Sequence, residues 1–128
     1  MRTKLLTPQD KITKMQIEIG RKLSAEYKEY SKIVYPYRLL IIKELYLHKT
    51  SFKNLKRVTT ITDGNLASHL RSLEENKIIE VIKEFENRRP KTSYILTKHG
   101  VKLYERLEKF LEDVIGLRCL NNKMEKQS

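Results

Sequence analysis

The sequence predicts an α+β fold that is mainly helical. Apolar side chains recur every three or four positions over several segments of the 128-residue chain, which is the period of an α-helix. Two short segments between residues 78 and 97 are rich in β-branched and aromatic residues, as in a β-hairpin. Hydrophobic residues make up 39% of the chain and charged residues 34%, which suits a small core under a charged surface. A single core with attached helices is expected.

Two helices are predicted in the first part of the chain, over residues 10–34 and from Pro36 to about residue 48. The first carries one apolar stripe, formed by Ile12, Met15, Ile19, Leu23, Tyr27, Tyr30 and Val34. Pro36 separates the helices because the residue before a proline avoids helical backbone, while proline suits a first helical turn. The second helix has a broad apolar face, so it should be deeply buried.

A short helix and a longer one follow, joined by a connection of β-branched residues. Ser51 can cap the short helix, which should end at Val58, and Thr62 can cap the longer helix over residues 63–75. The buried stripe of the longer helix consists of Leu66, Leu70 and Leu73. Asn76 is expected to end this helix in left-handed backbone.

Strands are predicted over residues 78–85 and 92–97, with a polar and basic hairpin tip at residues 86–91. Thr97 can then cap a final helix. That helix carries two adjacent apolar stripes, Tyr104, Leu107, Leu111 and Val114 in one and Leu103, Phe110 and Leu117 in the other. The last residues, 121–128, are polar and should be frayed.

The composition favours some functional classes and argues against others. A net charge of +11 favours polyanionic partners such as DNA or RNA. Cys119 is the only cysteine, and the histidines His48, His69 and His99 lie on other elements without metal-binding spacing, so no metal site is expected. Motifs for phosphate loops or nucleophilic catalysis are missing, so we expect neither a cofactor nor an enzyme. No apolar run is long enough for a membrane span, so we expect no membrane partner and a cytoplasmic location.

The order of the elements is informative. A helix, a short helix, a turn, a second helix and a hairpin with a basic tip form the plan of a winged helix-turn-helix. Within this plan the chain resembles the small MarR/ArsR-like group of winged-helix regulators, in the segments TDGNLASHL at 62–70, LEE at 73–75 and RRPKT at 88–92. The resemblance covers about residues 35–110. Such proteins usually have glycine at the positions of Asn76 and Asn87, and asparagine also tolerates left-handed backbone.

This resemblance implies sequence-specific, dimeric binding to double-stranded DNA that controls transcription, and it implies repression in particular. Helix 63–75 would enter the major groove, and the hairpin tip would reach the DNA backbone or the minor groove. The candidate base contacts on the face opposite the leucine stripe are Gly64, Asn65, Ser68, His69, Arg71 and Ser72. The candidate contacts to the backbone or minor groove are Lys53, Lys56, Arg57, Thr62, Arg88, Arg89 and Lys91.

The terminal helices are predicted to form a homodimer, because their apolar stripes have no obvious partner within the chain. The predicted interface consists of Ile12, Met15, Ile19, Leu23, Tyr27, Leu103, Phe110 and Leu117. This gives an N-terminal dimerisation helix at 1–34, a DNA-binding core at 35–97, and a C-terminal dimerisation helix with its tail at 98–128. The alternative is that both helices fold back on their own domain.

Two other functions use the same fold. A winged helix can be a protein-interaction module within transcription machinery, although a basic hairpin tip argues against it here. RNA binding would require exposed aromatic rings for stacking, whereas most of the seven tyrosines fall in or beside apolar stripes. The sequence leaves open the operator, the target genes, activation as against repression, a small-molecule or redox signal, and the role of Cys119.

Overall fold

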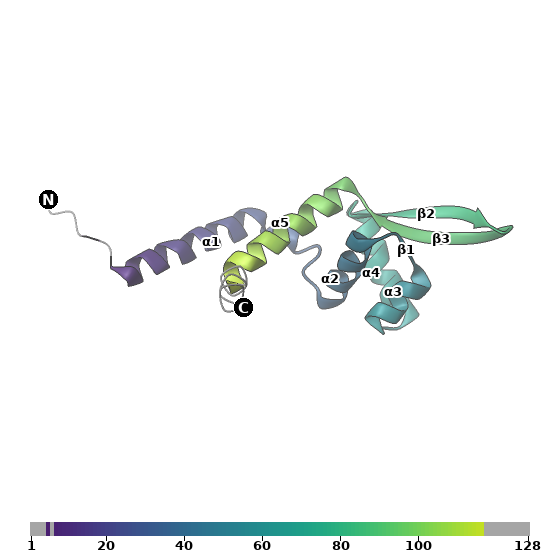
Figure 1. The fold of residues 1–128 in the computed structure, drawn as a ribbon, viewed down its shortest axis with the longest axis horizontal. Helices are drawn as coiled ribbons and strands as arrows, with labels where there is room; N and C mark the ends of the chain where they lie inside the picture. The colour runs from purple at the N-terminus through teal and green to yellow at the C-terminus, as the bar shows by residue number, and fades with distance from the viewer. Residues whose placement is uncertain (1–4, 6, 117–128) are drawn as a thin grey trace, which may run out of the picture. The chain divides into compact units, whose positions relative to one another are not determined.

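The computed structural model describes residue 5 and residues 7–116. These residues form five helices and one small antiparallel sheet (Figure 1). The elements in chain order are α1 (Pro8–Tyr30), α2 (Pro36–Leu47), β1 (Thr50–Ser51), α3 (Phe52–Thr59), α4 (Asp63–Glu75), β2 (Ile79–Glu86), β3 (Arg89–Leu96) and α5 (Lys98–Ile115). The predicted α+β, mainly helical winged-helix fold is confirmed.

The described residues divide into two compact units, one formed by Glu29–Arg106 and the other by those that fall within 1–28 and 107–128. The first unit contains all strands and helices α2 to α4, together with the end of α1 and the first half of α5. Tyr30, at the end of α1, is buried there, and its hydroxyl donates a hydrogen bond to the Arg106 carbonyl oxygen at 3.5 Å. This unit is therefore wider than the predicted core at 35–97.

The core of the first unit is aliphatic. Its fully enclosed side chains are Ile33, Ile41, Ile42, Leu55, Leu66, Leu73, Ile78, Ile79 and Leu103, together with Thr59. The predicted inward stripe of α4 is confirmed, because Leu70 is buried along with Leu66 and Leu73. Burying each side chain of this size contributes about 1.5–3 kcal/mol.

Side-chain caps fix the start of α3 and of α4, the two helices of the helix-turn-helix. The Ser51 hydroxyl accepts a hydrogen bond from the Asn54 backbone N–H at 3.2 Å, and the Thr62 hydroxyl accepts one from the Asn65 N–H at 3.2 Å. Both caps were predicted from the residue types. The connection between the helices turns at Thr60, which has left-handed backbone with φ 59°.

The structure also differs from the prediction at several element ends. The first helix ends at Tyr30 rather than at residue 34, because the chain turns there and buries Ile33 in the core. The prediction of left-handed backbone at Asn76 is wrong, since its φ is −85° and its side-chain amide donates to the Ser72 carbonyl oxygen. Lys77 takes the left-handed conformation instead, with φ 60°.

The sheet has the strand order β1-β3-β2, and all its pairs are antiparallel. Strand β1 was not predicted, because two residues are too few for a period to be recognised. The predicted six-residue hairpin tip is wrong, since Glu86 pairs with Arg89 and only Asn87 and Arg88 form the turn. Both turn residues have positive φ, 51° and 65°, as in the tight turns whose twist matches that of the strands.

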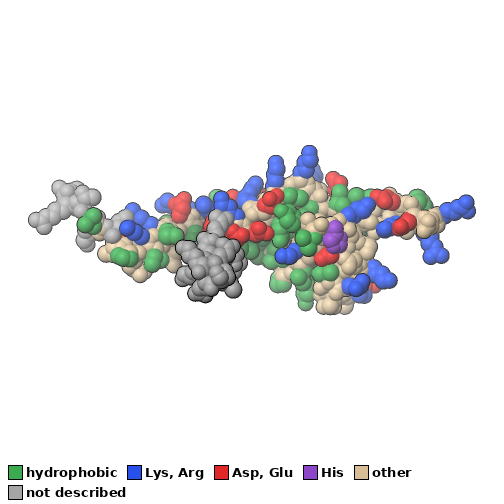
Figure 2. Space-filling model, in the orientation of Figure 1, with side chains coloured by type: hydrophobic (Ala, Val, Ile, Leu, Met, Phe, Trp, Pro, Cys, Tyr) green, Lys and Arg blue, Asp and Glu red, His purple; other side chains and the backbone are tan. Residues whose placement is uncertain are grey.

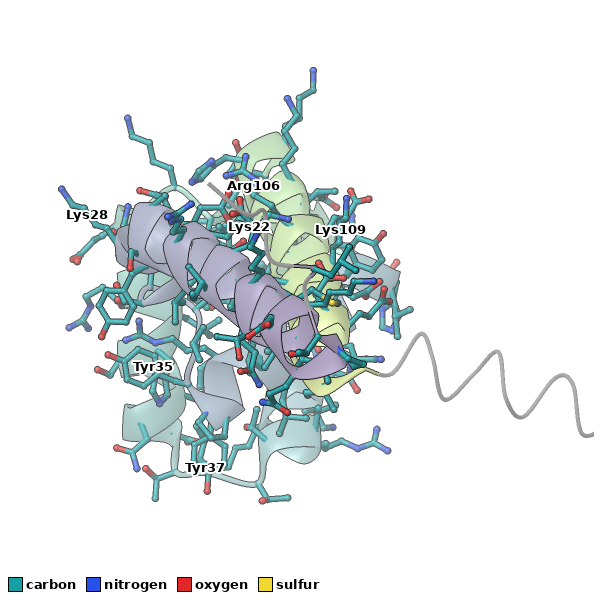
Figure 3. All side chains as sticks on the ribbon, turned by 90° about the vertical axis from the view of Figure 1, so that its left-hand side faces the viewer. Lys22, Lys28, Tyr35, Tyr37, Arg106 and Lys109 are labelled. Atoms are coloured by element: carbon teal, nitrogen blue, oxygen red, sulfur yellow. The ribbon has the colours of Figure 1, made fainter. Side chains whose placement is uncertain are left out.

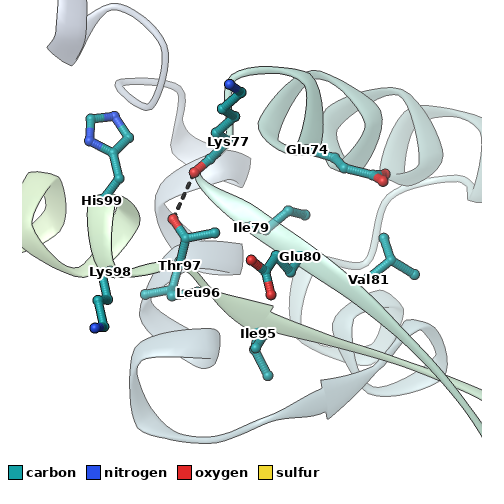
Figure 4. Close-up of a pocket in the computed structure, with 10 residues that line it drawn as sticks. All are labelled: Glu74, Lys77, Ile79, Glu80, Val81, Ile95, Leu96, Thr97, Lys98 and His99. Carbon is teal, nitrogen blue, oxygen red and sulfur yellow. Dashed lines mark hydrogen bonds between the residues drawn. The ribbon is translucent and has the colours of Figure 1, made fainter.

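The start of α5 is held against the start of the hairpin. The Thr97 hydroxyl donates to the Lys77 carbonyl oxygen at 2.7 Å (Figure 4). It also accepts from the Gly100 N–H at 3.0 Å, so the predicted cap is confirmed. A Cβ atom on Gly100 would lie 2.2 Å from the carbonyl oxygen of Ile78. Only glycine therefore allows this close approach between helix and strand.

Candidate nucleic-acid interface

The exposed face of α4 is polar and open. Asn65, Ser68 and Arg71 are exposed on it, and Gly64 beside them has no neighbour within 4 Å of the place where a Cβ would stand. Ser72 is half-buried at the margin of this face. The structure thus brings these five predicted base contacts to one side of α4, opposite the buried leucines. Asparagine and arginine suit hydrogen bonding to base edges, and small residues permit close approach.

His69 differs from the other five candidates because its ring is engaged within the chain. Its Nδ1 atom accepts a hydrogen bond from Nε of Arg38 at 3.1 Å, and it is half-buried. Burial, and then the neighbouring charge of Arg38, lower the pKa of His69 below its ordinary value. His69 is therefore a neutral contact between α4 and α2, with Nε2 as its remaining polar atom.

Arg38 is a functional candidate that no sequence pattern predicts. Its Nη1 atom donates to the Lys32 carbonyl oxygen at 2.9 Å, and its guanidinium lies 4.5 Å from the centre of the Tyr35 ring. The Tyr37 ring lies 6.4 Å from that of His69, and Figure 3 shows Tyr35 and Tyr37 at the start of α2. No local pattern signals this group, since its members are spread from residue 32 to residue 69.

Helix α3, which precedes α4, carries three cationic side chains. Lys53, Lys56 and Arg57 are all exposed, as phosphate contacts must be. Lys56 forms an ion pair with the carboxylate of Asp63 at the start of α4, so part of its charge is neutralised. Within the part of the chain that the structure describes, Lys53 and Arg57 form no ion pair. The Thr62 hydroxyl is exposed but serves as the cap of α4.

The hairpin, or wing, carries a second group of cations. Figure 2 shows Lys and Arg side chains at its free end, where Arg88, Arg89 and Lys91 are all exposed. Lys91 lies 2.9 Å from the Glu86 carboxylate, which raises the pKa of its ammonium group. Arg88 and Arg89 form no ion pair with any described residue. Their charges are thus the ones most available to a phosphate or to a narrow minor groove.

An open hollow of about 830 Å³ lies beside the base of the hairpin (Figure 4). Its walls include the apolar side chains of Ile79, Val81 and Ile95 together with the charged residues Glu74 and Lys77. Charges of both signs line it, so it does not favour a polyanion. No sequence pattern predicts this hollow.

The terminal helices present most of the predicted interface residues. Ile12, Met15, Leu23 and Tyr27 are exposed on α1, while Ile19 and Phe110 are half-buried. The prediction that Leu103 lacks a partner in its own chain is wrong, because it is only 2% exposed. Leu103 and Leu107 are four residues apart and therefore share one helix face, and both are buried. Leu117 and Cys119 lie outside the described residues.

Both terminal helices also carry charged side chains. Figure 3 shows Lys22 and Lys28 on α1 and Lys109 on α5.

None of the described helices is long and apolar enough to cross a membrane. No group of three metal-ligating side chains occurs among residues 5 and 7–116.

Comparison with known proteins identifies the family. The profile of the family described as winged helix DNA-binding domain matches residues 37–115. A transcriptional regulator homologue from Pyrococcus horikoshii OT3 is 29% identical, with a TM-score of 0.64 over 80% of this chain and 95% of that one. No curated protein matches the chain.

Two further structures share the fold at lower identity. One, described as a MarR-family transcriptional regulator from Enterococcus faecalis V583, is 21% identical, with a TM-score of 0.63 over 98% of this chain and 99% of that one. The other is MepR from Staphylococcus aureus in complex with DNA, which is 19% identical, with a TM-score of 0.61 over 88% of this chain and 92% of that one. The chain therefore belongs to the winged helix DNA-binding domain family, and its fold is that of the MarR-family transcriptional regulators.

Proposed function

We propose that the chain is a dimeric, sequence-specific DNA-binding regulator that represses transcription by occupying its operator. The observation that carries this proposal is the open polar face of α4, bordered by cations without ion-pair partners among the described residues. Lys53 and Arg57 lie on α3, and Arg88 and Arg89 lie at the end of the wing. A reading helix flanked by phosphate-binding groups is what recognition in the major groove requires.

Asn65 and Arg71 are the residues that we propose for base reading. Both are exposed, and six positions separate them, nearly two helical turns, so they would meet different base pairs. Asn65 can bond both edge atoms of an adenine, and Arg71 can bond a guanine or a phosphate. Gly64, Ser68 and Ser72 would allow the helix to approach closely, and Nε2 of His69 is available at the margin.

We propose that the terminal helices join two copies of the chain. The exposed apolar stripe of α1 supports this, since a row containing Ile12, Met15, Leu23 and Tyr27 is unfavourable in water. A two-fold axis would bury two such rows together and would place two α4 helices about 34 Å apart, one turn of DNA. Repression rests on the resemblance to MarR/ArsR-like regulators.

Selection of genomic DNA by the purified protein tests this function. We expect enrichment of a few sites with an imperfect palindrome whose half-sites are about one helical turn apart. If the enriched fragments share no sequence, the protein binds DNA only nonspecifically, which would contradict the proposed sequence-specific recognition. The absence of DNA binding, together with capture of a defined component of the transcription machinery, would favour the alternative of a protein-interaction module.

A further inference from the structure

The wing carries an exposed aromatic ring that the proposed function does not use. Phe85 lies at the end of β2 and is 80% exposed, the most exposed aromatic side chain among the described residues. It pairs with Pro90 across the hairpin, so the two apolar side chains are neighbours on one face of the sheet. This hairpin end projects away from the helices of its unit (Figure 1). The ring therefore has no packing role in its own domain.

The two faces of the wing differ in charge. Side chains alternate along a strand, so all three acidic residues of β2, Glu80, Glu84 and Glu86, share one face. Their contacts agree with this, because Glu84 lies 3.3 Å from Lys49 and Glu86 lies 2.9 Å from Lys91. The opposite face carries Phe85 and Pro90 with no acidic residue of β2 or β3.

The acid-free face also carries Lys83 and Thr92, which form the next pair on this face of the hairpin. Farther along, Figure 4 shows Ile79 and Val81 of this face on the side of the hairpin that faces Glu74, near the end of α4, and Ile95 of the other face on the opposite side. Tyr94 pairs with Val81 on this face, and burial and then the neighbouring charge of Glu74 raise its pKa. The face thus lies on the side of α4, the proposed reading helix. An apolar ring beside Lys83, with arginines at the adjoining turn, complements the sugars and phosphates of a DNA groove.

We propose that Phe85 inserts into the minor groove of the bound DNA, next to the site read by α4, and packs against its sugars and base edges. The inference rests on the proposed function, because it requires that α4 meets double-stranded DNA. Apolar wedges from proteins bind the minor groove in this manner and widen or kink it. The arginines then supply the salt-dependent part of the wing's affinity, and Phe85 supplies a part that does not depend on salt.

The chain has no tryptophan, so Phe85→Trp places a single fluorophore in the wing. We expect its emission to change when a duplex is bound and acrylamide to quench it less in the complex. Leu47→Trp is the matched control, since Leu47 is 64% exposed at the end of α2. Neither its emission nor its quenching by acrylamide should change when a duplex is bound. An unchanged Phe85→Trp signal on a duplex that binds would overturn the inference.

Titrations of a duplex with Phe85→Ala at several salt concentrations give an independent measurement. We expect affinity to fall about tenfold at every salt concentration, with the salt slope unchanged. Binding equal to wild type would overturn the inference while leaving the proposed function intact. If the wild-type protein itself bound no duplex, the proposed function would fail and this inference with it.

Discussion

Arg38 of α2 donates its Nε–H to Nδ1 of His69 in α4, across 3.1 Å. The same guanidinium donates a second hydrogen bond to the Lys32 carbonyl oxygen and lies over the ring of Tyr35. The proposed reading helix is thus fixed through a side chain on its margin to the helix behind it. Because Nδ1 can accept this bond only when it is unprotonated, the contact depends on the charge of His69.

This relationship predicts a pH dependence of stability. The pKa of His69 is lowered from 6.5 in the folded chain, so the unfolded chain binds the proton more readily. Neutral His69 therefore contributes to the free energy of unfolding. This contribution is complete above about pH 6.5 and is lost as the pH falls through that value towards the lowered pKa. His69→Asn keeps an acceptor for Arg38 but does not titrate.

Melting temperatures at about pH 7.5 and about pH 5.5 test this prediction. We expect wild type to lose more stability between these two values than His69→Asn does. His48 and His99 are present in both proteins, so the comparison isolates the effect of His69. Equal losses would show that protonation of His69 has no effect on stability, which would contradict the prediction.

Gly100 is predicted to be essential for the packing of α5. In Gly100→Ala the new Cβ would collide with the Ile78 carbonyl oxygen, which must shift along with β2. We expect a loss of about 1–3 kcal/mol in the free energy of unfolding, measured with urea. Gly20→Ala is the control, since nothing lies within 4 Å of its Cβ and alanine favours helix, so stability should rise slightly.

Arg88 and Arg89 are predicted to provide affinity rather than specificity. Replacing both by alanine should weaken binding to all duplexes and reduce the salt slope by roughly 1 for each lost phosphate contact. Lys91→Ala should have a smaller effect, because Glu86 already neutralises part of its charge. Salt titrations that do not distinguish the double variant from wild type would exclude the wing arginines from binding.

The stripe of α1 is predicted to hold the dimer together. Ile12→Glu with Met15→Glu places two charges in it, at side chains that are 49% and 65% exposed, so each chain should still fold. Light scattering should then give the mass of a monomer, and operator affinity should fall strongly. Ile17→Glu is a matched control on another face of α1, where the side chain is 51% exposed. A dimer that persists in the double variant would place the interface elsewhere.

Local sequence signals predicted most of the fold. The caps at Ser51, Thr62 and Thr97 could be predicted because a hydroxyl before an apolar period has few other roles. The ends of the hairpin turn could not be predicted, because Arg89 and Pro90 are typical loop residues. In the structure both strands extend to the turn. Exposed strand ends lack the apolar alternation that would have revealed this.

The site was predictable where it depends on one helix, and less so where it depends on contacts between helices. The exposed face of α4 follows from the positions of its leucines alone. The contact of Arg38 with His69 joins residues that are 31 positions apart, and no local pattern encodes it. Leu103 was misplaced for a related reason, since a helix with two apolar stripes does not reveal which of them its own domain covers.

The central claim is that α4 reads DNA sequence through Asn65 and Arg71. Selection from a random duplex library by wild type and by the Asn65→Ala and Arg71→Ala variants tests it most directly, with Glu75→Ala as an exposed control on the same helix. We predict that each of the first two variants loses about 1–3 kcal/mol on the best wild-type site and loses its preference at particular base pairs, while Glu75→Ala keeps the wild-type profile. Profiles identical to wild type in both variants would contradict the claim.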